Sequence, residues 1–378
     1  MRFLRTLSTR RLLALCLSAI AVAAGGTAIA LAGGSGPVPP QKPLARAVHD
    51  GLTAPQVQGI TARVKFTNHL IDSSGIHGAN PLLTGATGRL WFAPGKGLRL
   101  ELQSDNGDAQ VVGNQQRFFV YDGTSNTAYE GKVPKHRATR AEKRHAIPSV
   151  GRIQQGLNKA RQHKLSISGP TPGNIAGQPA YTVRVGPAQP GGLLGAVELA
   201  WDAARGLPLR VAVYARGNSD PVLELVATDI SYGPVDTSNF AIKPPADAHV
   251  VNVATGGGKQ DRVQRRAVSK LPFKVTAPAT LAGRKRSGVR VLHGKVAVVR
   301  YGRNLDGLVV VEKAVKNPDS QAGGRHHLDF PTVDVNGATA KVIDTPLGSV
   351  VTFQRGGVSY TVLGSVHAAV TEAAARGL

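Results

Sequence analysis

The sequence predicts an α+β protein, in which an antiparallel sheet covered by helices is followed by a small second α+β domain. Three observations predict this class. Short runs that alternate apolar and polar residues recur between residues 60 and 232, and Gly, Asn and Asp separate them, as is typical of antiparallel strands. One stretch, residues 147–161, changes to helical spacing. A Gly-rich, basic segment at residues 253–270 then precedes further hairpin patterns.

The first residues have the composition of an export segment. Residues 1–32 join a basic start, MRFLRTLSTRR, to an uncharged apolar run that contains Ala-x-Ala sites. The apolar run is also long enough to span a bilayer, so the segment is interpreted as a signal peptide or a signal anchor. Residues 33–41 are rich in Gly and Pro and are interpreted as a flexible spacer. We therefore expect the protein to be extracytoplasmic, either secreted or membrane-anchored.

The charge balance narrows the class of partner. The chain has 46 Lys and Arg against 23 Asp and Glu, a net charge of +23, and one Cys, which excludes a disulfide framework. Nucleic acid is the first expectation for such a basic chain inside a cell. The export segment and the scarcity of stacking aromatics argue against nucleic acid here. Anionic membrane or wall surfaces, or an acidic protein face, are the expected partners, and a solvated basic surface is the plain alternative.

Residues 42–252 form the larger predicted domain. KPLARAVHDGLT (42–53) has a helical apolar stripe, and GITARVKFTN alternates cleanly as a strand with one wet face. SDNGD (104–108) carries the Asn-Gly signal of a hairpin. Residues 147–161 are predicted to form an amphipathic covering helix, with Ile147 and Ile153 on its apolar stripe. Strand patterns then resume, and FAIKPPADAHVV closes the domain.

Residues 271–378 form the small C-terminal α+β domain, joined by the basic linker at 253–270. KVAVVRYG and GLVVVEKAV flank RNLDG, while GSVVTFQ and VSYTVLG flank RGG, so two hairpins are expected. SVHAAVTEAAARGL is predicted to be the closing helix, with Ser365 as its N-cap.

No catalytic constellation is present in the sequence. It has no Gly-x-Ser-x-Gly elbow, no His-Glu-x-x-His and no Gly-x-Gly-x-x-Gly after a strand. His326 and His327, with Asp329 nearby, are the one cluster weighed as a metal site, but neighbouring strand residues face opposite sides. Asp202 and Asp229 end strands, which is typical of turn residues. We therefore predict a protein that is not an enzyme, with no metal and no cofactor.

The stretch VELAWDAARGLPLRVAVYARG (197–217) holds two alternating runs around Asp-x-x-x-Gly-Leu-Pro. With IAGQPAYTVRVGP before it and SNFAIKPPADAHVV after it, this stretch resembles the lipoprotein-carrier (LolA-like) superfamily, from about residue 45 to 252. The resemblance implies a half-open antiparallel β-barrel covered by helices, with acyl chains held in the cleft. LDGLVVVEKAV, GSVVTFQRGGVSYTVLGS and AAVTEAAARGL resemble the second domain of RseB/MucB-like regulators in the same superfamily.

The resemblance implies an apolar cleft as the binding site. Its candidate residues come from strands that would share one face and from the helix that would cover it: Val64, Phe66, Leu98, Leu100, Leu102, Val150, Ile153, Leu157, Val197, Leu199, Trp201, Leu209, Val211 and Val213. Ordinary core packing is the alternative for each residue alone. The expected function is an exported protein that holds lipid or acylated protein, as a carrier or a lipid sensor. The alternative is an RseB-like negative regulator that binds the extracytoplasmic part of an anti-sigma factor.

Overall fold

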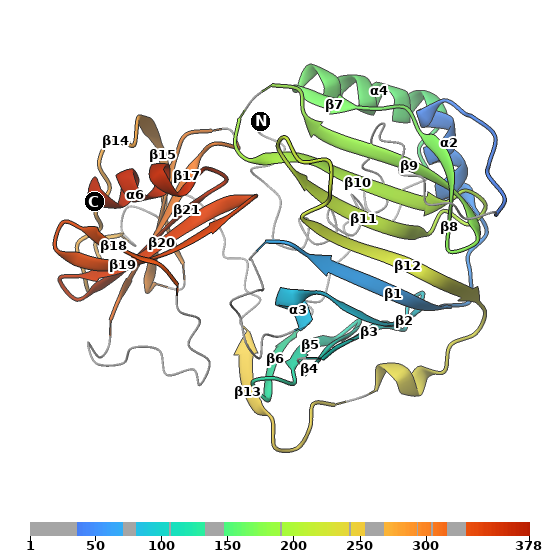
Figure 1. Cartoon of the computed structure of the whole chain (residues 1–378), viewed down its shortest axis with the longest axis horizontal. Coiled ribbons are helices and arrows are strands. Elements are labelled where there is room, and N and C mark those ends of the chain that lie inside the picture. Colours follow the sequence, from blue (N-terminus) through green and yellow to red (C-terminus); the bar gives the residue numbers. More distant parts are fainter. Residues whose placement is uncertain are drawn as a thin grey trace. The chain divides into compact units, whose positions relative to one another are not determined.

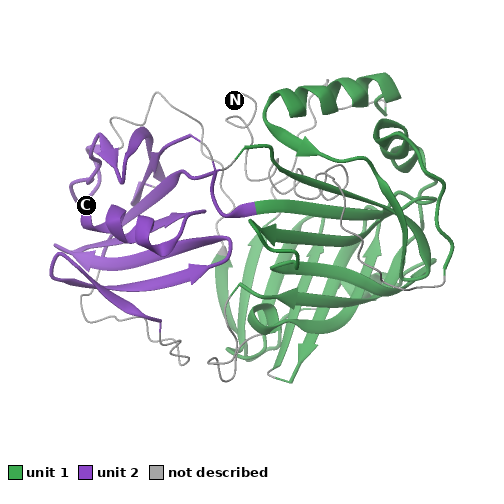
Figure 2. Ribbon diagram, turned by 45° about the horizontal axis from the view of Figure 1, so that its top comes forward, with its two compact units in different colours: residues 1–189, 195–257 green, residues 190–194, 258–378 purple. Residues whose placement is uncertain are grey.

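The structure is a computed structural model that describes residues 36–70, 81–105, 107–132, 147–189, 191–241, 243–253, 268–292, 294–303, 305–315 and 330–378. The chain divides into two compact units, residues 1–189 with 195–257 and residues 190–194 with 258–378 (Figure 2). The predicted export segment, most of the predicted linker, and the cluster of His326, His327 and Asp329 lie outside the described residues.

Thirteen strands of the described chain form one sheet in the first unit, in the order β13-β6-β5-β4-β3-β2-β1-β12-β11-β10-β9-β7, with β8 also paired to β9 (Figure 1). The strands are β1 (Ile60–Asn68), β2 (Ala86–Ala93), β3 (Gly97–Ser104), β4 (Gly107–Asn114), β5 (Arg117–Asp122), β6 (Thr127–Lys132), β7 (Leu165–Ile167), β8 (Thr171–Ile175), β9 (Gln178–Pro187), β10 (Leu194–Asp202), β11 (Pro208–Ala215), β12 (Leu223–Tyr232) and β13 (His249–Val253). The helices of this unit are α2 (Leu44–Thr53), α3 (Pro81–Thr84), α4 (Val150–Gln162) and the 3₁₀ turn η4 (Thr237–Phe240).

Strand β1 shows how the sequence sets the two faces of this sheet. Ile60, Ala62 and Val64 are buried, while the residues between them are exposed, as the alternation predicts. β1 pairs antiparallel with β2 on one side and with β12 on the other. The edge strand β13 is the exception, because it runs parallel to β6. The sheet curls, as Figures 1 and 2 show, and this open, mostly antiparallel sheet agrees with the half-open barrel that the resemblance implies.

The two longer helices of the first unit lie beside strands β9 to β11 (Figure 1). Helix α4 begins at Val150, because the side chain of Ser149 caps it by accepting a hydrogen bond from the backbone N–H of Arg152. The prediction that Ile147 belongs to the helical stripe is therefore wrong, and its side chain is 51% exposed. Ile153, by contrast, is buried against the sheet as predicted.

The residues just before α2 are held on the sheet by hydrogen bonds. The side-chain amide of Asn174 donates a hydrogen bond to the carbonyl oxygen of Pro37 at 3.0 Å. The hydroxyl of Tyr181 donates a hydrogen bond to the carbonyl oxygen of Pro40 at 2.5 Å. Gln41 reaches back to the carbonyl oxygen of Pro170. The described part of the predicted spacer thus runs along β8 and β9.

The second unit has its own sheet and core. Eight described strands lie in the order β14-β15-β16-β17-β21-β20-β19-β18. They are β14 (Thr280–Leu281), β15 (Arg284–Leu292), β16 (Val296–Tyr301), β17 (Leu308–Ala314), β18 (Thr332–Val335), β19 (Ala338–Thr345), β20 (Gly348–Arg355) and β21 (Val358–Gly364). Helix α6 (Ala368–Arg376) packs on β20 and β21. Both predicted hairpins are present, β16–β17 and β20–β21.

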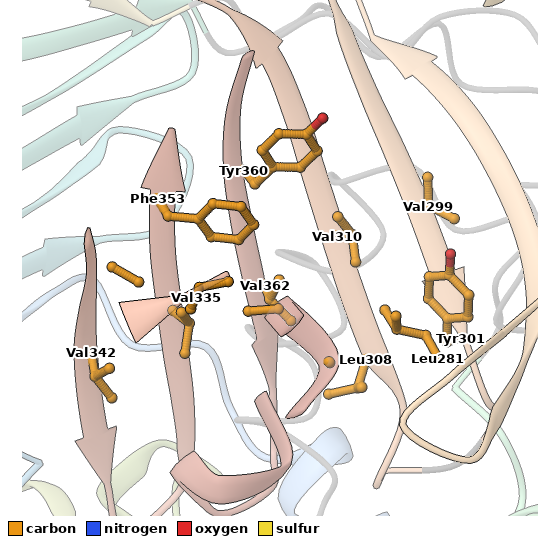
Figure 3. Close-up of a cluster of buried hydrophobic side chains, with 14 of the residues drawn as sticks. Leu281, Val299, Tyr301, Leu308, Val310, Val335, Val342, Phe353, Tyr360 and Val362 are labelled. Carbon is orange, nitrogen blue, oxygen red and sulfur yellow. The ribbon is translucent and has the colours of Figure 1, made fainter. Parts of the chain in front are cut away.

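The core of the second unit gathers side chains from most of these strands (Figure 3). Val299, Val310 and Val362 are fully buried in neighbouring strands, and the rings of Phe353 and Tyr360 stack with centroids 5.0 Å apart. Such burial is ample for a unit that folds around its own apolar centre.

The predicted N-cap of the closing helix is wrong. Helix α6 begins after His367, whose side chain makes no capping hydrogen bond. The hydroxyl of Ser365 instead donates to the carbonyl oxygen of Leu347 at 2.8 Å. The Ser365 hydroxyl, two residues before His367, thus joins the end of β21 to the start of β20 instead of capping the helix. Local cap preferences do not predict this contact, because Leu347 is far from Ser365 in the chain.

Candidate functional site

One row of apolar side chains crosses, from strand to strand, the face of the first unit's sheet that the helices partly cover. In an antiparallel ladder, residues directly opposite each other point to the same face. Following the register from β1 through β2, β3, β4, β5 and β6 to β13 gives an unbroken apolar sequence of partners, which we name the apolar ladder: Ala62, Leu90, Leu100, Val111, Val120, Tyr129 and Val251.

The apolar ladder is closed at β1 and open toward β13. Ala62 is 5% exposed and lies within a buried cluster. Val111, Val120 and Val251 are half-buried, and Tyr129 is 43% exposed. Among the described residues, none of these four belongs to a buried apolar cluster. Aliphatic side chains in adjacent strands therefore keep part of their surface uncovered along this end of the sheet.

At the opposite end of the sheet, helices α2 and α4 cover the apolar side chains of β9, β10 and β11. Leu199 and Trp201 of β10 pair with Val183 and Tyr181 of β9, and all four are buried. The rings of Tyr181 and Trp201 lie 5.9 Å apart. Helices α2 and α4 complete this cluster, to which six predicted cleft residues belong: Val150, Ile153, Leu157, Leu199, Trp201 and Val211. Three of the six are on α4 and three are on β10 and β11, so contacts between helix and sheet account for their burial.

The middle of the sheet is covered by the short helix α3. Val64, Leu102 and Leu209 are 5, 2 and 3% exposed in a second cluster, with Phe66 and Leu100 packed at its margin. Leu82 of α3 lies against this cluster, and the Leu82 carbonyl accepts a hydrogen bond from Asn68 at 2.6 Å.

The last three predicted cleft residues are half-buried and lie in separate places. Leu98 pairs with Phe92 and Gly113, Val197 pairs with Val185, and Val213 pairs with Leu223. The strand residues that the prediction named share one face, and most of them lie under helices α2, α3 and α4. The prediction missed the uncovered part, which comes from AQVVGN, QRFFVYDG and NTAYEG. Alternation within these three strands was the available signal.

The Asp-x-x-x-Gly-Leu-Pro motif forms the turn between β10 and β11. Asp202 has no exposed surface, and its Oδ1 accepts from the backbone N–H groups of Ala204 and Arg205 at 2.7 and 2.9 Å. Its Oδ2 accepts from the hydroxyl of Tyr232 at 2.6 Å. Burial and this carboxylate raise the pKa of Tyr232 well above its ordinary range. The motif is a structural turn that ties β10 to β12.

Gly206 lets this turn approach helix α2. Its φ is +68°, and a Cβ there would overlap the carbonyl oxygen of Gly51. Gly51 in turn lies against the indole of Trp201. The regular stretch around residue 201 therefore positions the α2 cover on the sheet and contributes no reactive group.

A polar network lies on β10 to β12, on the face opposite the helices. The guanidinium of Arg210 bonds the carboxylates of Glu198 and Glu224 and donates to the hydroxyl of Tyr214 at 3.0 Å. Burial lowers the pKa of Arg210, but Tyr214 and the two carboxylates more than offset this and raise it. Arg184 stacks on the Tyr214 ring at 4.0 Å. These charges neutralise one another, so the network is structural.

Two kinds of feature are absent from the residues that the structure describes. No group of three or more His, Cys, Asp or Glu in the described ranges is placed to hold a metal ion. None of the helices in those ranges has the length and apolarity that a membrane crossing requires.

The first unit is thus an open, curled antiparallel sheet with helices over part of one face, followed by a small α+β unit. This is the helix-covered, open sheet followed by a small second domain that we expect from the sequence. No family model matches the chain, and no curated protein matches it.

Solved structures to which this chain is similar include the MucA/MucB complex of Pseudomonas aeruginosa, at 16% identity and TM-score 0.38, covering 88% of this chain and 94% of that chain. An uncharacterized conserved protein from Thermus thermophilus matches at 13% identity and TM-score 0.33, over 55% of this chain and 96% of that chain. A putative outer membrane lipoprotein-sorting protein domain from Vibrio parahaemolyticus matches at 10% identity and TM-score 0.21, over 52% of this chain and 95% of that chain.

Proposed function

We propose that the first unit is a non-enzymatic binding module that holds an apolar chain, the acyl chain of a lipid or of an acylated protein, against the apolar ladder. The observation that carries the proposal is the unbroken row of apolar partners from β1 to β13, with Val111, Val120 and Val251 only half-buried. The export segment predicted from residues 1–32 supports an extracytoplasmic place of action.

The energetics of the ladder favour a chain-like ligand. Neighbouring strands lie about 4.8 Å apart, so the open part of the row, across the four strands β4, β5, β6 and β13, extends for roughly 14 Å. Each methylene removed from water contributes about 0.8 kcal/mol, so twelve of them contribute roughly 10 kcal/mol before the ordering costs of binding. Binding of this kind needs no polar contact and no covalent step, and it is reversible.

The test uses the chain from residue 36 onward, with lipids extracted and identified by mass spectrometry, and with uptake of a fluorescent fatty acid. Val111→Ser combined with Val120→Ser should weaken fatty-acid binding about tenfold, because polar groups replace apolar contact at the centre of the open row. Val250→Ser is the matched control. It changes an equally small residue, 45% exposed, whose pairing with Ala128 places it on the opposite face.

The control is expected to bind the probe as the unmodified chain does. Repeated recovery of a lipid-free protein that takes up no fatty acid contradicts the proposal. So does an equal loss of binding in the Val250→Ser variant.

The second candidate function is an RseB-like negative regulator that binds the extracytoplasmic part of an anti-sigma factor. The observation that favours it is the second unit, whose complete core makes it a folded module that the apolar ladder does not require. A pulldown from solubilised membranes separates the candidates. Capture of one single-pass membrane protein, retained by the Val111→Ser, Val120→Ser double variant, supports the regulator, and loss of capture in that variant supports acyl recognition.

The charge of +23 supports a further part of the proposal, docking on an anionic envelope surface. Flotation with liposomes of increasing anionic lipid content should show binding that rises with that content and falls with salt. Equal flotation on neutral and anionic liposomes contradicts it.

A further inference from the structure

A cavity of about 640 Å³ lies on the face of the first unit's sheet opposite the apolar ladder. Its floor is apolar. Val112 of β4 and Phe119 of β5 pair directly and are 3 and 7% exposed, and Phe240 at the end of η4 is 6% exposed. Val112 and Phe119 each neighbour a ladder residue in sequence, so they point to the other side of the sheet.

The rim of this cavity is positively charged. Arg117, Lys132 and Lys243 line it, and all three are exposed. Glu130 is the one acid among the lining residues, which leaves the rim with an excess of positive charge. Within the described part of the chain, neither Arg117 nor Lys243 forms an ion pair with an acid.

The register adds an independent observation. Arg117 and Lys132 are direct partners in the β5–β6 ladder. Direct partners share one face of a sheet, so both side chains stand on the face that the cavity occupies. The amide side chains of Asn114 and Gln116 stand at the same rim and offer hydrogen-bond donors.

We propose that this cavity binds a compact anionic ligand, with a phosphate or carboxylate group on an apolar body. The apolar body rests on Phe119 and Phe240, and the anion lies between Arg117 and Lys243. The volume falls within the range of about 300–1,000 Å³ that is usual for small-molecule sites. The site is separate from the acyl-binding face, so it gives the unit a second ligand of a different class.

The test is calorimetric titration of the chain from residue 36 onward with 1-naphthyl phosphate, 1-naphthol and inorganic phosphate. Naphthyl phosphate should bind more tightly than either of its halves, and its affinity should fall as salt is added. Combining Arg117→Gln with Lys243→Gln should weaken binding about tenfold, since two charge-assisted contacts are lost at an exposed rim. Lys65→Gln, an exposed cation on β1 outside the cavity, is the matched control.

A second variant tests the cavity without changing charge. Ala241→Trp places an indole at an exposed lining position and should abolish binding of naphthyl phosphate while leaving fatty-acid uptake intact. The Val111→Ser, Val120→Ser double variant should bind naphthyl phosphate normally and lose fatty-acid binding. The two variants therefore distinguish an error in this proposal from an error in the proposed acyl site. Binding no tighter than that of inorganic phosphate, or an equal loss in Lys65→Gln, overturns the proposal.

Discussion

Glu312 lies without exposed surface in the core of the second unit, on β17 between Ala297 of β16 and Tyr360 of β21. Its Oε2 accepts a hydrogen bond from the backbone N–H of Thr276 at 2.9 Å, and its buried Oε1 has no partner among the described residues. Burial raises the pKa of this carboxyl to about 7, while the Thr276 hydrogen bond opposes the shift. The ionised form is therefore disfavoured inside the folded unit.

This pKa makes the stability of the second unit depend on pH in a defined direction. The folded state holds a proton that the unfolded state releases near pH 4.5, so stability is greatest below that pH and falls as pH rises through 7. A shift from 4.5 to about 7 corresponds to a loss of about 3 kcal/mol in the free energy of unfolding between pH 4.5 and 8. Glu312→Gln has the same shape and no titration, so it should remove this slope.

Unfolding by urea at pH 5, 6, 7 and 8 measures the effect. Both tryptophans, Trp91 and Trp201, lie in the first unit, so their fluorescence follows that unit alone and should be the same in the variant. Pulse proteolysis of second-unit peptides follows the other transition. Glu372→Gln is the control, because Glu372 forms an exposed helical pair with Arg376 that contributes only tenths of a kcal/mol. Equal pH slopes for the unmodified chain and Glu312→Gln would refute the reasoning.

Two further predictions concern the β10–β11 turn, and both use urea unfolding followed by tryptophan fluorescence. Gly206→Ala should destabilise the first unit by about 3 kcal/mol or more, because the added Cβ overlaps Gly51. The control Gly217→Ala, at a φ of +82° with open space around it, should cost about 1 kcal/mol. Similar losses in the two variants would contradict the close approach of Gly206 to Gly51. Asp202→Asn should cost about 2–3 kcal/mol, because it replaces a buried carboxylate oxygen, which accepts hydrogen bonds, by an NH₂ group that faces other donors. The control Asp229→Asn changes an exposed carboxylate and should change stability by less than about 0.5 kcal/mol. An Asp202→Asn variant as stable as the unmodified chain would show that the carboxylate does not hold the turn together.

The sequence predicted where strands lie and which side of each strand is apolar. It did not predict which apolar side chains of the sheet the helices would cover. In β1 and in the β10–β11 stretch, the alternation placed Val64, Leu199 and Trp201 on the buried face where the structure has them. It did not indicate that α2 and α4 would cover Leu199 and Trp201 while Val120 remained half open. Coverage depends on where helices dock, and that depends on contacts between residues far apart in the chain.

The sequence by itself determined the main strands, their two faces and the Asp202 turn, because side-chain alternation and turn chemistry are local properties of a few residues. Only the tertiary structure decided which strands are neighbours, such as β1 beside β12 and β13 beside β6. The apolar ladder, the basic-rimmed cavity and the buried Glu312 all follow from that choice, since each joins residues whose proximity comes from long-range pairing.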